Sequence, residues 1–150
     1  MDYPPLIPYL VVSNATAAID FYKDAFGAIE LTRHQAGDSP LIAHAHLSIN
    51  GGSIMLSDDF STLMGGESMT PEALRGTPVT LHLQLDDVDS LWNRAVAAGA
   101  TVKMELADQF WGDRYGQLVD PFGHKWSLGQ RKTTLSEEEI QAASKAFFKA

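Results

Sequence analysis

The strongest constraint on this chain is an internal repeat in the order of its strand and helix patterns. Two segments with helical spacing of apolar residues each end at a glycine, Gly27 and Gly99, and these glycines lie 72 positions apart. Each segment follows a strand-like stretch and precedes further β-like stretches. Because a repeated order of elements indicates a repeated structural unit, we predict two copies of one β-α-β-β-β module and an α+β fold.

The first copy begins with a predicted strand over Leu6–Val12. Pro8 favours an edge position for this strand, because proline has no N–H to donate across a sheet. Ser13 or Asn14 is expected to cap the following helix by accepting a free backbone N–H. The apolar face of that helix is spaced three or four residues apart and consists of Ala18, Phe21, Tyr22, Ala25 and Phe26. Three more strands are predicted over residues 28–35, 41–49 and 53–58, with a hairpin turn at Asn50-Gly51-Gly52.

The second copy repeats this pattern from Val79 onward. A strand is predicted over Val79–Leu85, and Asp86 or Asp87 is expected to cap the next helix. The apolar face of this helix has the same spacing and consists of Val88, Leu91, Trp92, Ala95 and Val96. The remaining strands are predicted over residues 101–105, 115–119 and 125–128, with a turn at residues 120–123 between the last two.

Two further segments lie outside the repeat. Residues 60–77 connect the modules and are expected to hold a short helix near residues 71–74. Ser136-x-x-Glu139 forms a capping box for a last helix over Leu135–Ala150, whose apolar stripe packs either on its own subunit or on a partner. We expect one domain over residues 1–130, with module one over 6–59, the linker over 60–77 and module two over 78–130, followed by a helical extension over 131–150.

Composition excludes several classes of function. The chain has 19 acidic and 11 basic residues, a net charge of −8 and no cysteine. The negative charge argues against nucleic acid and anionic membranes as partners, and the lack of cysteine excludes disulfides and thiolate metal sites. No apolar run is long enough to cross a bilayer, and the N-terminus lacks a basic segment followed by an apolar stretch, so we expect a cytoplasmic protein.

Polar side chains alternate with apolar ones along one strand of each module. His44, His46 and Ser48 alternate with apolar residues in the first module, and Thr80, His82 and Gln84 do so in the second. Since alternate residues of a strand face opposite sides of a sheet, the apolar sets are expected to pack on the helices and the polar sets to share the other face. That face is either the wall of a binding cleft or an ordinary solvated sheet face.

Several motifs resemble one known family. They are Pro8-Tyr9-Leu10-Val11-Val12, the helix segment from Ala18 to Gly27, Ile54-Met55-Leu56-Ser57-Asp58, Trp111-Gly112-Asp113-Arg114-Tyr115-Gly116 and the segment from Asp120 to Trp126. Together, over about residues 6–130, they resemble the glyoxalase/bleomycin-resistance/extradiol-dioxygenase superfamily, also called vicinal oxygen chelate, and within it the PhnB-like branch. The resemblance implies paired βαβββ modules whose mixed sheets curl around a cup-shaped cleft, a ligand in that cup and a frequent homodimer.

The resemblance also implies where a metal would be held. Metal enzymes of the superfamily carry ligands at inward positions of the first and last strand of each module, and the matching positions here are Ile7, Leu56, Thr80 and Ser127. None of these is His, Glu or Gln, so we expect no metal and no cofactor. A displaced site made by His44, His46 and His82 is the alternative.

The cup-lining positions supply the candidate ligand-binding residues. They are Tyr9, His44, His46, Thr80, His82, Gln84, Trp111 and Ser127. Tyr9 is either a stacking and hydrogen-bonding residue or a core tyrosine, and Trp111 is expected to contact the ligand. Arg114 either holds an anion or forms an ion pair with Asp113 or Asp120 that fixes its loop.

Three hypotheses for function follow. The first is a metal-independent protein that binds a small, planar or aromatic molecule, as the superfamily's drug-sequestering resistance proteins do. The second is an enzyme of the isomerase or lyase type that uses His46 or His82 as a general base, or the displaced histidine metal site. The third is an interaction module that uses the last helix as its contact.

Overall fold

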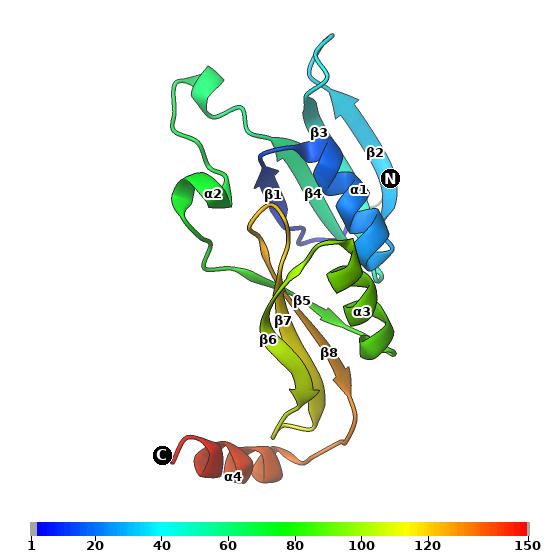
Figure 1. Ribbon diagram of the computed structural model, residues 1–150, viewed down its shortest axis with the longest axis vertical. Helices are drawn as coiled ribbons and strands as arrows, with labels where there is room; N and C mark the ends of the chain where they lie inside the picture. Colours follow the sequence, from blue (N-terminus) through cyan, green and yellow to red (C-terminus); the bar gives the residue numbers. More distant parts are fainter. Residues whose placement is uncertain (1–2, 150) are drawn as a thin grey trace.

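The computed structural model describes residues 3–149 and contains two βαβββ modules followed by a helix (Figure 1). Module one consists of β1 (Tyr9–Val12), α1 (Ala15–Phe26), β2 (Ile29–Gln35), β3 (Ile42–Ile49) and β4 (Gly52–Asp58). Module two consists of β5 (Thr80–Gln84), α3 (Val88–Ala98), β6 (Thr101–Asp108), β7 (Asp113–Val119) and β8 (Lys125–Arg131). The linker holds η1 (Thr62–Met64) and α2 (Pro71–Leu74), and α4 (Glu137–Phe147) follows module two. The predicted α+β fold class is therefore confirmed.

The two modules share one sheet topology. The strand orders are β1-β4-β3-β2 and β5-β8-β7-β6, with a parallel first pair and antiparallel pairs elsewhere in both sheets. β1 and β5 therefore occupy edges, as Pro8 predicted for the first strand. The Pro8 carbonyl accepts from the Met55 N–H at 2.9 Å, next to the first residue of β1 that pairs with β4.

The local signals that set the helix ends are those expected from the sequence. The Asn14 side chain accepts from Ala17 N at the start of α1, and the Asp87 side chain accepts from Ser90 N at the start of α3. Gly27 ends α1 with φ of 67°, a left-handed conformation that favours glycine. Asn50 and Gly51 also have positive φ, as the hairpin signal predicted.

Strands β6, β7 and β8 are longer than predicted. They extend to Asp108, from Asp113 and to Arg131, beyond the predicted ranges 101–105, 115–119 and 125–128. A Cβ atom at Gly116 would lie 2.6 Å from the Trp92 ring, so the missing side chain lets α3 pack against β7. Pairing of β7 with β8 then continues to Asp113 and Arg131.

A buried carboxylate joins the two modules. Asp120, in the turn between β7 and β8, accepts hydrogen bonds from the Tyr22 hydroxyl of α1 at 2.6 Å and from Trp126 Nε1 at 2.9 Å. Its other oxygen accepts from the backbone N–H of Phe122 and His124. The Phe26 and Trp126 rings lie 4.6 Å apart beside it. One interface thus combines aromatic packing with a fully hydrogen-bonded anion.

The packing of α1 against α3 adds to this contact between the modules. α1 and α3 lie side by side, with module one above and module two below in Figure 1. Among residues 3–149, no strand of one sheet pairs with a strand of the other. The face of each sheet that points away from its helix is therefore not covered by the other sheet of the same chain.

The last helix is attached at the far end of module two (Figure 1). Ser136 and Glu139 form the predicted capping box. Phe147 contacts Phe110 of the same chain, with ring centroids 5.1 Å apart, yet no α4 residue is buried. No helix in the described part of the chain is long and apolar enough to span a membrane. Met1, Asp2 and Ala150, which fall within the predicted domain and last helix, lie outside the described residues.

The Tyr22–Asp120 hydrogen bond gives a stability prediction. Burial raises the pKa of Tyr22 well above its usual value, and the charge and hydrogen bond of Asp120 raise it further. We expect Tyr22→Phe to lower the free energy of unfolding by about 1.5–3 kcal/mol, measured by urea denaturation, because the bond has a charged acceptor. In the parent protein this stability is present below about pH 10 and declines at higher pH, since only the unfolded chain then loses the tyrosine proton.

The matched control is Tyr3→Phe, which removes the hydroxyl of a half-exposed tyrosine. Equal stability losses in the two variants would contradict a special role for Tyr22.

Candidate functional site

The uncovered face of module one carries Tyr9, His44 and His46. The register pairs Tyr9 of β1 with Met55 of β4, and Met55 with His46 of β3, so their side chains share the face opposite α1. The Tyr9 hydroxyl lies 3.0 Å from His44 Nδ1. His34 of β2 stands opposite His44, with ring centroids 5.9 Å apart. This face therefore presents a row of imidazoles beside a phenol.

His46 differs from its neighbours because it is buried. Its exposed fraction is 1%, and its Nε2 lies 2.9 Å from the Ser53 hydroxyl oxygen. The ring of Tyr3 lies over it, with centroids 5.1 Å apart. Its Nδ1 has no hydrogen-bond partner among residues 3–149.

Burial also sets the charge state of His44. Burial lowers the pKa of His44 from its usual value, and the neighbouring His34 and His46 lower it further. The ring is therefore neutral at neutral pH. A neutral imidazole beside a phenol favours an uncharged, hydrogen-bonding ligand surface.

The uncovered face of module two is built around His82. Its Nδ1 lies 2.8 Å from the Ser127 hydroxyl oxygen, and its Nε2 lies 2.8 Å from Gln84 Oε1. An amide oxygen only accepts, so Nε2 carries the proton and Nδ1 accepts from Ser127. Gly129 leaves room for this arrangement, because a Cβ there would lie 3.1 Å from the His82 ring.

Aromatic rings extend this second face. The Tyr115 ring stacks on His82 at a centroid distance of 5.9 Å, and Trp111 meets Tyr115 edge-on at 5.3 Å. Gln117 donates to the Tyr115 hydroxyl oxygen at 3.1 Å, which leaves the hydroxyl hydrogen free to donate. Trp111 is half-buried between Phe110 and Tyr115 rather than an isolated exposed side chain.

Thr80 lies where the modules meet. It lines a cavity of about 390 Å³ with Lys103, Gln117 and Trp126. It also lines a cavity of about 240 Å³, whose walls come from both modules and include Ser53 of β4 and His82 of β5. Among the predicted residues, Thr80 is the one that borders both cavities.

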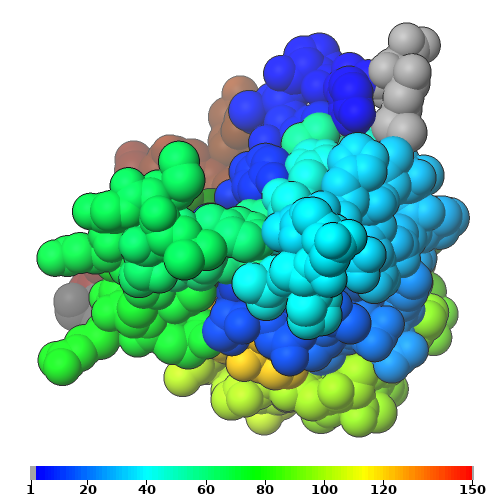
Figure 2. Space-filling model, turned by 90° about the horizontal axis from the view of Figure 1, so that it is seen from above, coloured from blue at the N-terminus to red at the C-terminus, as the bar shows by residue number. Residues whose placement is uncertain are grey.

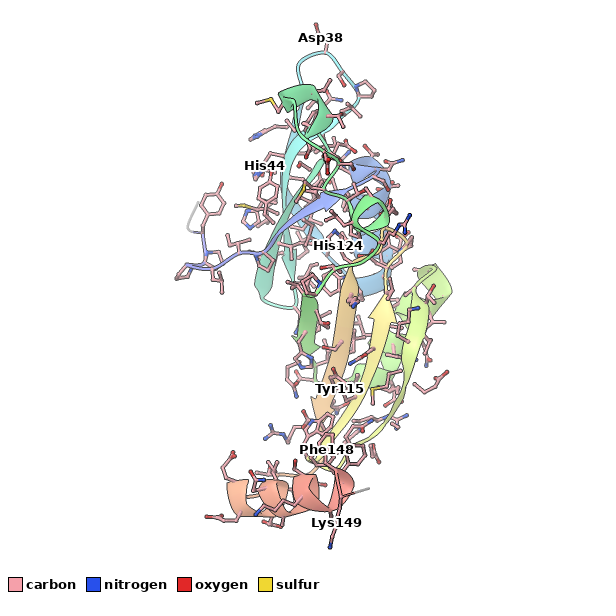
Figure 3. All side chains as sticks on the ribbon, turned by 90° about the vertical axis from the view of Figure 1, so that its left-hand side faces the viewer. Asp38, His44, Tyr115, His124, Phe148 and Lys149 are labelled. Carbon is pink, nitrogen blue, oxygen red and sulfur yellow. The ribbon has the colours of Figure 1, made fainter. Side chains whose placement is uncertain are left out.

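The predicted residues therefore form two groups within one chain. Tyr9, His44 and His46 lie on the first sheet, while Thr80, His82, Gln84, Trp111 and Ser127 lie on or beside the second. Figure 3 shows His44 in the upper half of the molecule and Tyr115, next to His82, in the lower half. One chain does not bring His82 to His44 and His46, so it does not assemble the displaced histidine metal site.

The residues at the family's metal positions do not suit a divalent ion. The prediction that Leu56 points into the cup is wrong, because Leu56 is fully buried in the core and pairs with Leu10 and Ala45. Alternation along β4 places Met55 at that position instead. Ile7 has no donor atom, a thioether is a soft ligand, and the Ser127 hydroxyl is bonded to His82. Within residues 3–149, no three His, Asp or Glu side chains are grouped to hold a metal ion.

Arg114 has the expected structural role but different partners. It pairs with Asp89 of α3 at 3.0 Å and with Asp108 of β6 at 3.5 Å, not with Asp113 or Asp120. Asp113 instead pairs with Arg131, and Asp120 is used in the contact between modules. The hydrogen bond from Arg114 lowers the pKa of Asp89. Arg114 therefore ties α3 to β7 rather than presenting a free cation.

Sequence reasoning missed several residues of these faces. They are Tyr3, Thr32, His34, Met55 and Gln117. Alternation along β2 could have indicated Thr32 and His34, because both share the face of His44 and His46. No pattern in the sequence indicated Tyr3, which precedes the first strand and reaches β3 only through the tertiary fold.

The histidine row gives a pH prediction. We expect His34→Gln to raise the pKa of His44 part of the way toward 6.5, because one neighbouring imidazole is removed while burial remains. Titration of the imidazole protons by NMR measures this. Since the folded pKa of His44 lies below its unfolded value, its contribution to stability is present above about pH 6.5 and declines as the pH falls through the folded pKa. His124→Gln, which alters an imidazole bonded to Val11 O, should leave His44 unchanged.

Comparison with known proteins places this architecture in one family. Residues 6–128 match the Glyoxalase/Bleomycin resistance protein/Dioxygenase superfamily. The uncharacterized protein Rv0887c of Mycobacterium tuberculosis is 56% identical over 140 residues, which cover 93% of this chain and 82% of that protein. The structure of TioX from Micromonospora sp. ML1 has a TM-score of 0.66 and 28% identity, covering 87% of this chain and 99% of TioX.

Two further structures have the same fold. The Arabidopsis thaliana At5g48480 protein has a TM-score of 0.64 and 29% identity, covering 85% of this chain and 98% of that one. A PhnB protein from Bacillus cereus has a TM-score of 0.65 at 18% identity, with 85% and 99% covered. The repeated βαβββ topology, the motifs and these matches agree, and the chain belongs to the Glyoxalase/Bleomycin resistance protein/Dioxygenase superfamily.

Proposed function

We propose that this protein binds a small molecule without a metal ion, on the imidazole- and tyrosine-lined faces of its two sheets. The observation that carries the proposal is the chemistry of these faces. The positions where metal enzymes of the family carry acidic and imidazole ligands hold Ile7, Met55, Thr80 and Ser127 here, and flat rings and hydrogen-bonding groups lie beside them. Such a surface suits a planar ligand with hydrogen-bonding substituents.

The second face has the features of a stacking site. Trp111, Tyr115 and His82 form a continuous run of ring contacts, and the Tyr115 hydroxyl has a hydrogen to donate. The net charge of −8 disfavours a phosphate-rich ligand and favours a neutral or cationic one.

The same geometry favours binding over catalysis by a general base. Both ring nitrogens of His82 are within hydrogen-bond distance of protein groups, and His46 is buried beneath Tyr3. A general base needs a nitrogen within reach of the substrate proton. An isomerase or lyase function is therefore the second candidate, and it requires that these contacts open first.

A second copy of the chain is the partner that would complete the cup. Within the described residues, the edge strands β1 and β5 are unpaired on one side, and a cavity of about 310 Å³ lined by Pro8, Tyr9, Leu10, Val79 and Leu81 lies against both. Val79 is an exposed apolar residue of this cavity, and Leu6, Met69 and Leu74, in segments that precede β1 and β5, are also exposed. Figure 2 shows the linker, in green, projecting on one side of the molecule. Exposed apolar surface beside free strand edges is typical of an interface.

Native mass spectrometry with elemental analysis of freshly purified protein tests the proposed function. We expect a bound organic molecule and no stoichiometric metal, and we expect dialysis against a chelator to leave the bound molecule in place. Trp111→Ala should weaken its binding by about 1–3 kcal/mol through loss of the stacked aromatic surface. Phe148→Ala, which removes an exposed aromatic at the C-cap of α4, is the matched control. A metal ion coordinated by protein atoms and needed for ligand retention would contradict the proposal.

The proposed homodimer has its own test. Val79→Asp, at a side chain that is 59% exposed beside β5, should weaken self-association about 10- to 100-fold, because an unpaired carboxylate would be buried in an apolar interface. Sedimentation velocity over a range of concentrations measures this. Val96→Asp, at a 39% exposed valine on α3, should leave association unchanged. A parent protein that is monomeric at all concentrations would contradict the dimer.

A further inference from the structure

Two neighbouring residues of module one, Thr32 and His46, each carry a buried polar atom. Thr32 Oγ1 and His46 Nδ1 have no hydrogen-bond partner among residues 3–149. Thr32 and His46 are directly paired across β2 and β3, so their side chains are neighbours on the face opposite α1. Buried polar groups are rarely left unpaired, because each loses its hydrogen bonds to water. A hydroxyl beside an imidazole nitrogen is suited to a guest that both donates and accepts hydrogen bonds.

The N-terminal segment covers this pair. β1 is the edge strand and β4 separates it from β3, so residues 3–8 cross β4 to bring Tyr3 over His46 (Figure 1). The Tyr3 and His46 rings are tilted by 34° with centroids 5.1 Å apart. Pro4, Pro5 and Pro8 restrict φ along this segment, which limits the conformations that it adopts when Tyr3 leaves.

The contact that holds Tyr3 over His46 is weak. Tyr3 is 52% exposed, and no hydrogen bond joins its side chain to another of residues 3–149. The segment is fixed at its other end, where Pro8 O accepts from Met55 N. A segment with one anchored end and one exposed aromatic contact belongs to the low-stability part of a structure and opens readily.

We propose that Tyr3 is an intramolecular lid over a ligand subsite, and that a planar ring with a group that donates and accepts hydrogen bonds replaces it between His46 and Thr32. The ligand class rests on the proposed function, whereas the lid does not. Tyr3 itself occupies the position of the planar ring. Opening the lid exposes His46 Nδ1 and Thr32 Oγ1 together, so ring stacking and hydrogen bonding become available in one step.

Labelling with diethyl pyrocarbonate tests the lid without any ligand. The reagent modifies accessible neutral imidazole nitrogens, and mass spectrometry reports each histidine separately. We expect His46 to react several-fold more slowly than the exposed His34 in the parent protein, and Tyr3→Ala to speed His46 several-fold while His34 is unchanged. Tyr3→Phe keeps the ring and should match the parent. Continued protection of His46 in Tyr3→Ala would overturn the lid, since a different element would then be the cover.

Benzamide, a flat ring with a donating and accepting carboxamide, tests the subsite. In Tyr3→Ala it should slow labelling of His46 several-fold and leave His34 unaffected. Adding Thr32→Val, which removes only the hydroxyl from a matched side-chain shape, should abolish this protection. Lack of protection by benzamide would overturn the ligand class, and protection that survives Thr32→Val would overturn the role of Thr32. A protein purified without any bound molecule would count against the proposed function but not against the labelling result.

Discussion

The buried Asp120 carboxylate, hydrogen-bonded to α1 from one module and to Trp126 from the other, fixes how the two halves of this chain meet. A buried anion is tolerated only when its oxygens are paired, and here two side chains and two backbone N–H groups satisfy it. The surrounding Phe26 and Trp126 rings exclude water, which strengthens these hydrogen bonds. The pKa of Tyr22 is raised for the same reason. Hydrogen bonding of the buried carboxylate and burial of the aromatic rings thus stabilise the same contact.

Because α1 is part of this contact, the contact determines which face of each sheet stays open. Each helix covers one face of its own sheet, and α1 packs on α3, so among residues 3–149 the remaining face of each sheet is not covered by the other sheet. These faces carry His44 and Tyr9 in module one and His82 and Tyr115 in module two. The sequence repeat therefore produces two related polar faces, one in each module, rather than one closed site. The proposed complement is a second copy, since β1 and β5 lie at the edges of their sheets.

The two polar faces belong to sheets of the same topology but differ in chemistry. At equivalent register positions, Tyr9 beside Met55 corresponds to His82 beside Ser127. In module two, Gln84 and Ser127 fix the imidazole tautomer in the open, whereas in module one His46 is enclosed by Tyr3 with an unpaired nitrogen. Neither set provides the carboxylates and converging imidazoles that a divalent ion requires. Stacking and neutral hydrogen bonding are the interactions that both halves retain.

The sequence by itself determined the elements of this protein. The spacing of Phe21, Tyr22 and Phe26, the caps at Asn14 and Asp87 and the positive φ expected at Gly27 and Asn50 are all local requirements, and each was confirmed. The polar faces of β3 and β5 also followed from alternation, because side-chain direction has a period of two. Leu56 shows the effect of a shift by one position along a strand. Motif spacing assigned Leu56 to the cup, but it lies in the core, and its neighbour Met55 lies on the open face.

Only the tertiary structure decided which residues meet. The partners of Arg114, the contact of Tyr22 with Asp120 and the placement of Tyr3 over His46 all join residues from separate elements. Such contacts depend on how the modules and termini pack, and that packing is the sum of many weak interactions that no single sequence window contains. Periodicity and capping act within a few residues, so the sequence specified the helices and strands. The packing of α1 against α3 determined where the polar faces of the two sheets lie.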